Sequence, residues 1–354
     1  MSAYLQLPLR EALPWLDGSG PEADIVISTR GRLLRNITAH EFPGHAKPNE
    51  RREVAEEILA GLAAVEPARG AHQVELGSLS GHQQMLLREK HLLAEGECRP
   101  EHHRHMVVSS DGLFVAKINN QDHLRLQCYA PGFQPGQVLA GLLEWETALD
   151  HHLDLAFQED FGYLTASPVD TGTGLHMSAL LHLPGLVMGG EIDKILNALR
   201  QLRFSVKGLF GRGRAVRGAL FLVTNLVTLG RDEQEVVSDF EFHIGKVLGH
   251  ERTARQQFFS SDSLGLEDLA RRSLAVVRNA LLMTSQEGYD RLNHLRLGAG
   301  LGMLPDLNFA QLNEALVAIQ TGHLEQEAGH PLTVPQKTEA RATYLRTLFA
   351  ENSS

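Results

Sequence analysis

Three short apolar runs that follow one another closely constrain the fold of this chain more than any other feature. They cover residues 107–109, 113–118 and 124–128, and only a few turn-forming or polar residues separate them. This spacing predicts three β-strands joined by tight turns. We therefore expect a mixed or antiparallel sheet.

Helical patterns accompany these strands. The clearest spans residues 137–157, where Leu142, Trp145 and Leu149 belong to one apolar stripe. Further helices are expected over residues 50–65, 83–94 and 232–249, the last with Asp232 and Glu235 in capping-box spacing. Further strands are expected over residues 24–28, 163–166 and 219–224, and another helix is expected to begin near Leu175.

The pattern becomes almost entirely helical from residue 255 onward, with expected helix starts at Asp262 and Asn308. The sequence therefore predicts an α+β fold in three parts. Residues 1–23 form an N-terminal extension, residues 24–254 a sheet domain and residues 255–354 a helical C-terminal module, which are ordinary domain sizes.

Composition and charge exclude several classes of protein. The chain has 354 residues, 43% of them hydrophobic, which is enough for a large core. A net charge of -10 argues against non-specific binding to nucleic acid or to a membrane surface. The two cysteines, Cys98 and Cys128, lack disulfide-framework or zinc-site spacing, which fits a reducing cytoplasm. We expect neither a secretory signal nor a membrane span, since no apolar run reaches ~18 residues.

Four segments, in a fixed order, carry the most specific signal in the sequence. They are residues 28–36 (STRGRLLRN), 119–125 (NNQDHLR), 167–175 (SPVDTGTGL) and 207–213 (KGLFGRG). In this order they resemble the motifs of the guanidino (phosphagen) kinase family, and most closely those of the bacterial protein arginine kinases. Walker-type and protein-kinase motifs do not occur in the sequence.

The resemblance implies a fold, a reaction and a set of ligands. The fold is a phosphagen-kinase-like catalytic domain with a large antiparallel sheet flanked by helices, followed by a helical C-terminal module. The reaction is transfer of the γ-phosphoryl group of ATP, with Mg²⁺, to a guanidinium nitrogen. Guanidinium groups suit this role because they pair with phosphate oxygens and keep their charge. The positions that match the family's nucleotide site are Ser28, Thr29, Arg30, Arg32, His91, Arg125, His176 and Lys207.

The positions that should grip the substrate guanidinium are substituted. Family members place two glutamates there, to align one nitrogen with the phosphoryl group and to take up its proton. Gln121 and Arg212 occupy these positions, and Ser167 replaces the family cysteine. Arg212 puts a cation where the substrate cation must bind, which costs on the order of 4 kcal/mol at ~4 Å and intermediate dielectric. His176 and Lys207 also replace family arginines.

The bacterial branch also has a C-terminal phosphoarginine pocket with the motif R-D-x-x-R-A. The matching stretch places Lys337, Arg341 and Ala342 at three of its positions, so the pocket is only partly retained. By family analogy alone, the partners are protein arginine or phosphoarginine residues and proteins of a quality-control protease complex. Whether the chain forms a homodimer is left open by the sequence.

Three hypotheses follow. The first is a catalytically impaired protein arginine kinase homologue that keeps nucleotide or phosphate binding and a regulatory role. The second is an active kinase that uses another carboxylate, with Asp122 first, then Asp170 and Glu144. The third is a kinase for small guanidino compounds, which lacks the same glutamates. No metal site is predicted from His102, His103 and His105, and Ser167 lacks the G-x-S-x-G setting of a serine nucleophile.

Overall fold

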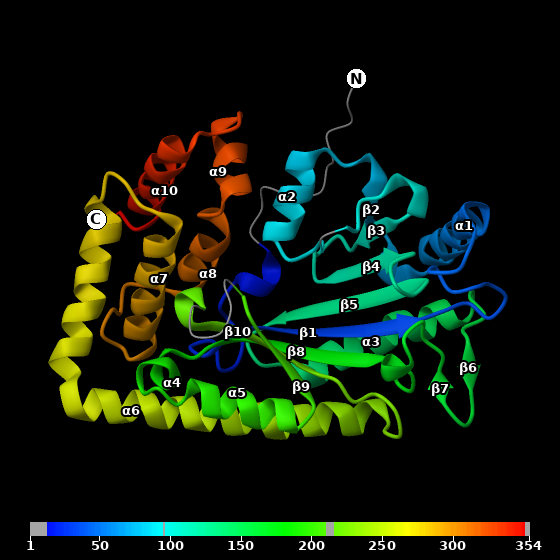
Figure 1. Cartoon of the computed structure of the whole chain (residues 1–354), viewed down its shortest axis with the longest axis horizontal. Coiled ribbons are helices and arrows are strands. Elements are labelled where there is room, and N and C mark those ends of the chain that lie inside the picture. The colour runs from blue at the N-terminus through cyan, green and yellow to red at the C-terminus, as the bar shows by residue number, and fades with distance from the viewer. Residues whose placement is uncertain (1–12, 95, 210–215, 351–354) are drawn as a thin grey trace.

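An eight-stranded antiparallel sheet forms the centre of the computed structural model, which describes residues 13–94, 96–209 and 216–350 (Figure 1). Its strand order is β2-β3-β4-β5-β1-β8-β10-β9. The strands are β1 (Val26–Arg35), β2 (His72–Glu75), β3 (His105–Val108), β4 (Phe114–Ile118), β5 (Leu124–Pro131), β8 (Leu175–His182), β9 (Phe204–Gly208) and β10 (Leu220–Asn225). The three strands predicted over residues 107–109, 113–118 and 124–128 are confirmed as β3, β4 and β5, and the structure pairs them antiparallel.

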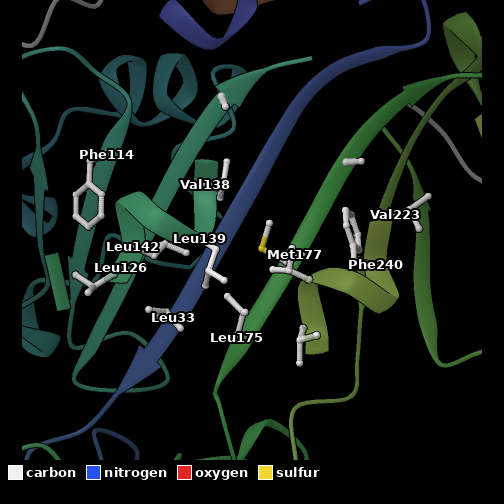
Figure 2. Close-up of a cluster of buried hydrophobic side chains, with 14 of the residues drawn as sticks. Leu33, Phe114, Leu126, Val138, Leu139, Leu142, Leu175, Met177, Val223 and Phe240 are labelled. Atoms are coloured by element: carbon white, nitrogen blue, oxygen red, sulfur yellow. The ribbon is translucent and has the colours of Figure 1, made fainter. Parts of the chain in front are cut away.

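One face of the sheet carries the main hydrophobic core, and Figure 2 shows its centre. Helices α3 (Pro135–Asp150) and α6 (Glu233–Asn279) supply Val138, Leu142 and Phe240 to it. Gly31 of β1 lets α3 approach, because a Cβ there would lie 2.6 Å from side-chain atoms of Leu142 and Val138. Helices α1 (Pro48–Ala64) and α5 (Ile192–Gln201) complete this layer.

The opposite face contacts the N-terminal turn and the C-terminal helices. A 3-10 turn at Pro14–Leu16 lies on the sheet, where Trp15 stacks on Tyr129 with ring centroids 5.3 Å apart. Tyr129 and Trp15 share a second apolar cluster with Leu295. The other helices are α2 (Gly81–Glu89), α4 (Pro184–Met188), α7 (Ser285–Gly300), α8 (Phe309–Ala318), α9 (Thr321–Ala328) and α10 (Val334–Leu348).

Helix α6 joins the sheet to the C-terminal helices. It begins at the predicted capping box, where Asp232 accepts a hydrogen bond from the Glu235 N–H at 2.7 Å. It kinks at Asp262, whose carboxylate accepts from the Gly265 N–H at 2.9 Å, as a residue that starts a helix does. Asn308 likewise caps α8. The three starts predicted at Asp232, Asp262 and Asn308 thus coincide with real helix signals.

The helix expected near Leu175 is wrong, because that segment is strand β8. Leu175, Met177 and Ala179 alternate with His176 and Ser178, and this period of two sends apolar groups to the core and polar groups to the other face. The strand lies between β1 and β10 and all its residues are buried. Its sequence therefore lacks the solvent-exposed polar face that usually identifies a strand.

Helices α3 and α2 end earlier than expected, and the strand expected over residues 163–166 covers only Gly162–Tyr163. Helix α3 ends at Asp150, and residues 154–156 instead continue along the end of β1, where the Ala156 N–H donates to Asn36. A small hairpin follows, made of β6 (Phe157–Gln158) and β7 (Gly162–Tyr163). Helix α2 ends at Glu89. Within the described residues, no helix is both long enough and apolar enough to cross a membrane.

Candidate functional site

Strand register places the predicted phosphate-binding cations on one face of the sheet. Arg32 lies opposite His176 on β8 and Gln127 on β5, so these side chains share a face. Arg30 and Arg125 stand two residues from Arg32 and Gln127 and point the same way. This face is opposite the one that α3 and α6 cover.

Lys207 of β9 also belongs to this face but stands further away. It pairs with Leu222 of β10, which pairs with Leu180 of β8. Because β9 is three strands from β1, Lys207 lies about 14 Å across the sheet from its register partner Ser28, at ~4.8 Å per strand, and Arg32 is four residues further along β1. Its side chain is exposed.

Arg30, Arg32 and Arg125 form a group that we call the arginine cluster. Their Nε atoms are buried, and none has a hydrogen-bond partner among the described residues. The pKa of Arg32 is lowered to about 9, first by burial and then by the charges of Arg30 and Arg125. Buried polar groups are normally hydrogen-bonded, and like charges in contact oppose folding. An anion such as a phosphate group would satisfy both requirements.

Glu97 is a counter-charge to this cluster that sequence reasoning missed. Its carboxylate accepts from Lys117 at 2.8 Å and from Asn120 at 3.0 Å, and it lies 3.6 Å from Arg125. Burial would raise the pKa of Glu97, but Lys117, the Ala94 N–H and Arg125 together outweigh burial and lower that pKa. Burial in turn lowers the pKa of Lys117 to about 8, although Glu97 opposes this. Glu97 lies outside any helix or strand, so no periodic pattern marks it.

His176 is held between two oxygen atoms. Its Nδ1 lies 3.1 Å from the Asn225 carbonyl oxygen, and its Nε2 lies 3.1 Å from Asp170. The hydrogen bond from His176 is the main reason that the pKa of Asp170 is lowered, and Ser167 also contributes a hydrogen bond. Ser167 therefore contacts a carboxylate that is already bound to histidine, which does not create a serine nucleophile.

Two residues of the first motif have structural roles instead. Thr29 is fully buried on the helix-covered face, where its hydroxyl donates to the Gly132 carbonyl at 2.6 Å, so the structure does not bring it to the arginine cluster. Arg35, which also belongs to this motif, is buried and pairs with Glu146 at 2.5 Å. Its guanidinium also stacks 3.4 Å from the Tyr163 ring centroid. Ser28 is buried on the same face as Arg30.

The acceptor side is only partly described. Gln121 is exposed at the turn between β4 and β5, whereas Arg212 lies outside the described residues. Asp122 is 1% exposed, and its Oδ1 accepts from Asn36 and from the Ala166 N–H, each at 2.8 Å. These contacts make Asp122 a brace between three segments and do not favour it as a substitute base.

The geometry does not favour the other two candidate carboxylates, Asp170 and Glu144, as a catalytic base either. Asp170 is bound to His176, and Glu144 lies on α3, which covers the opposite face of the sheet. Among the described residues, no three His, Cys, Asp or Glu side chains are placed to hold a metal ion together.

His91 lies beside the arginine cluster and has a left-handed backbone with φ of 57°. Burial, and then the charge of Arg30, lower its pKa from 6.5 to about 4. The unfolded chain therefore binds a proton that the folded chain rejects, so stability falls as the pH drops from above 6.5 toward 4. The loss amounts to on the order of 2 kcal/mol at pH 5.

We predict that His91→Asn reduces this acid sensitivity, since Asn also tolerates a left-handed backbone. Denaturant unfolding at pH 7.5 and pH 5 measures it. His103→Asn is the matched control, because His103 also has positive φ, at 45°. Equal pH dependence in wild type and His91→Asn would contradict the assignment.

The residues predicted for a phosphoarginine pocket are engaged with other groups. Lys337 pairs with Glu325 at 2.9 Å. The Arg341 guanidinium is buried and donates to the carbonyl oxygens of Ile319 and Met283 at 2.9 and 3.0 Å, and Ala342 is 1% exposed. A cavity of about 900 Å³ lies nearby among α8, α9 and α10, and neither Lys337 nor Arg341 lines it.

Two family models match most of the chain. The family model described as ATP:guanido phosphotransferase, C-terminal catalytic domain, matches residues 53–254. The model described as protein-arginine kinase McsB C-terminal domain matches residues 263–354.

Individual relatives are similar along almost the whole chain. The protein-arginine kinase of Halalkalibacterium halodurans is 36% identical over 349 residues, 97% of each chain. That of Bacillus cereus (strain B4264) is 33% identical over 341 residues, 96% of each chain.

Solved structures share the fold of about two thirds of the chain. A duplicated taurocyamine kinase from Schistosoma mansoni has a TM-score of 0.58 and 21% identity, over 69% of this chain and 35% of that one. Lombricine kinase has a TM-score of 0.57 and 23% identity, over 68% and 71% of the two chains. At this identity the likeness concerns the fold, which is that of the phosphagen kinases.

Proposed function

Because this chain belongs to the ATP:guanido phosphotransferase family, in its protein-arginine kinase branch, we propose that it binds nucleotide phosphates but has lost phosphoryl transfer to arginine. The observation that carries the first half is the arginine cluster, with three buried Nε atoms that lack hydrogen-bond partners among the described residues. An anion with several oxygens would complete these donors and relieve the repulsion among the three charges.

The second half rests on the acceptor side. Phosphoryl transfer depends mainly on alignment and on charge placed around the reacting groups. Gln121 lacks the charge that would grip a guanidinium, and Arg212 has the opposite charge. Asp122, the first alternative carboxylate, is almost fully buried, and its Oδ1 is already bound by Asn36 and the Ala166 N–H. The donor half of a kinase site is thus retained without an acceptor half.

Such a protein fits a regulatory role. We propose ATP or ADP as ligands, with Mg²⁺ arriving as the nucleotide complex and supplying charge neutralisation of the phosphates. Arg30, Arg32 and Arg125 would hold the phosphate oxygens, while Glu97 keeps Arg125 in place. The partners would be protein arginine or phosphoarginine residues and quality-control proteins in the cytoplasm, with a homodimer as one assembly. These partners rest on family analogy.

We predict measurable ADP and ATP binding that weakens as salt rises, because the contacts are electrostatic. Titration calorimetry on the full chain tests it. Arg32→Ala should weaken binding at least about tenfold, since it removes a charge-assisted hydrogen bond. Arg69→Ala is the control, because Arg69 is exposed and pairs with the exposed Glu66. Absence of heat at millimolar nucleotide, or equal affinity in Arg32→Ala, would contradict the proposal.

A further inference from the structure

We propose that the tip of the β6–β7 hairpin, residues 157–161, is a docking surface for a basic, arginine-bearing segment of a partner protein. The proposal deepens the proposed function, on which it rests, because it names where and by what chemistry that partner would bind. The hairpin projects beyond the main sheet, on the side away from helices α7 to α10 (Figure 1).

The tip exposes aromatic rings beside carboxylates. Phe157 and Phe161 are 57% and 50% exposed, and the two residues Glu159 and Asp160 between them are exposed as well. Phe157 makes an edge-on ring contact with Tyr163, with centroids 5.2 Å apart. Two exposed phenylalanines on one short tip are poorly explained by folding, since their burial elsewhere would be more favourable.

The base of the same hairpin shows what these groups can bind. Tyr163 of β7 holds the guanidinium of Arg35 at 3.4 Å from its ring centroid, and Glu146 pairs with that guanidinium at 2.5 Å. An aromatic face together with a carboxylate therefore already holds one arginine. The tip presents the same two kinds of group to solvent, where a guanidinium of another protein can stack on a ring and pair with a carboxylate.

Charge selects the partner class. Glu159 and Asp160 repel phosphate-rich surfaces, so nucleic acid and anionic lipid do not fit, and the net charge of -10 favours a cationic partner in general. Position adds the link to the site. Tyr163 is bridged to Gly172 of the Gly-Thr-Gly turn, and Ser167 follows four residues later, within about 14 Å of chain. A segment bound at the tip would lie beside the acceptor side of the site.

The test uses the full chain and a short fluorescein-labelled peptide in which arginines alternate with leucines and serines. The reference peptide carries citrulline, which has nearly the same shape without the charge, at every arginine position. Fluorescence anisotropy measures binding to wild type and to two tip variants, Glu159→Gln/Asp160→Asn and Phe157→Ser/Phe161→Ser. The matched control is Glu267→Gln/Asp268→Asn, which removes the same charge from the exposed surface of α6.

We expect each tip variant to weaken arginine-peptide binding roughly tenfold and the control to change it by less than about twofold. The citrulline peptide should bind at least about tenfold more weakly than the arginine peptide. Equal losses in tip and control variants, unchanged binding in both tip variants, or equal binding of the two peptides would each overturn the proposal. ADP titration of the same variants should be unchanged. If ADP binds and the peptide does not, the docking surface is wrong and nucleotide binding stands.

Discussion

The wild-type chain is expected to transfer no phosphoryl group from ATP to arginine, and Gln121→Glu/Arg212→Glu is the smallest change expected to restore transfer. Arg212→Glu alone removes the repulsion but leaves half of the guanidinium grip missing. Gln121→Glu alone leaves the cation in place, and the new carboxylate can pair with it. Because a repulsion of ~4 kcal/mol corresponds to a factor of roughly a thousand, the double variant should exceed the sum of the two singles.

The measurement is acid-labile phosphate transfer from labelled ATP to an arginine-rich protein. Adding Arg32→Ala to the double variant should abolish the restored activity, which ties it to the arginine cluster. Adding His176→Arg and Lys207→Arg should increase it, because a guanidinium fork aligns phosphate better than imidazole or ammonium does.

A different outcome separates the hypotheses. If wild type is already active, and Gln121→Ala and Arg212→Ala leave that activity intact, the impaired-kinase proposal is wrong. Asp122→Asn then becomes the decisive variant. Asp122 accepts hydrogen bonds from Asn36 and Ala166. The thermal stability of the Asp122→Asn variant must therefore be compared with that of wild type before an activity loss is assigned to chemistry.

The second large effect concerns the stability of the whole chain. Arg255→Met is expected to lower the free energy of unfolding by about 3–5 kcal/mol, because it leaves a buried carboxylate without its counter-charge. Glu251 is fully buried and binds Arg255 at 2.6 Å. Arg255 also donates to the His182 carbonyl at 3.1 Å and lies 3.3 Å from Asp24, so it joins α6 to β8 and to the N-terminal segment.

Helix α6 offers its own control for this prediction. Arg271 and Glu267 form the same i,i+4 pair at 2.7 Å, but their side chains are 65% and 40% exposed. Arg271→Met should therefore cost no more than about 0.5 kcal/mol. Urea unfolding measures both variants, and equal losses would contradict the role of burial.

The pH dependence of Arg255→Met gives a second check. Burial already raises the pKa of Glu251, and Arg255 opposes that rise. Without Arg255 the folded-state pKa rises further above the unfolded value, so the folded variant binds a proton more tightly than the unfolded chain. Its deficit relative to wild type should therefore shrink as the pH falls from 7 toward 5.

The sequence predicted the sheet and most helix starts because those signals are local. Strand period, tight turns and capping residues such as Asp232 and Asn308 act within a few residues. Strand β8 was mistaken for a helix. It is buried on both faces and carries polar residues of the site on one of them, so its alternation of polar and apolar residues is hard to recognise in the sequence. The burial of both faces, which distinguishes β8 from the strands that were predicted correctly, is not visible in the sequence.

The residues of the site that belong to motifs were predicted, whereas contacts between distant residues were not. Motif order indicated Arg30, Arg32 and Arg125, and register places all three on one face. Arg35 looked equivalent in the sequence, but its three-residue offset from Arg32 turns it toward Glu146 and Tyr163. Glu97 could not be found, because its partners Lys117, Asn120 and Arg125 come from distant segments that only the fold brings together.

The packing of α6 before its kink at Asp262 limits how this molecule can be divided. The two family models meet between residues 254 and 263, and this join lies within α6, around that kink. A fragment that stops at residue 254 loses Arg255 and leaves Glu251 and His182 without it. Recombining this sheet domain with a C-terminal module from another relative would therefore require the exchanged piece to begin before Glu251, or to bring a compatible arginine with it.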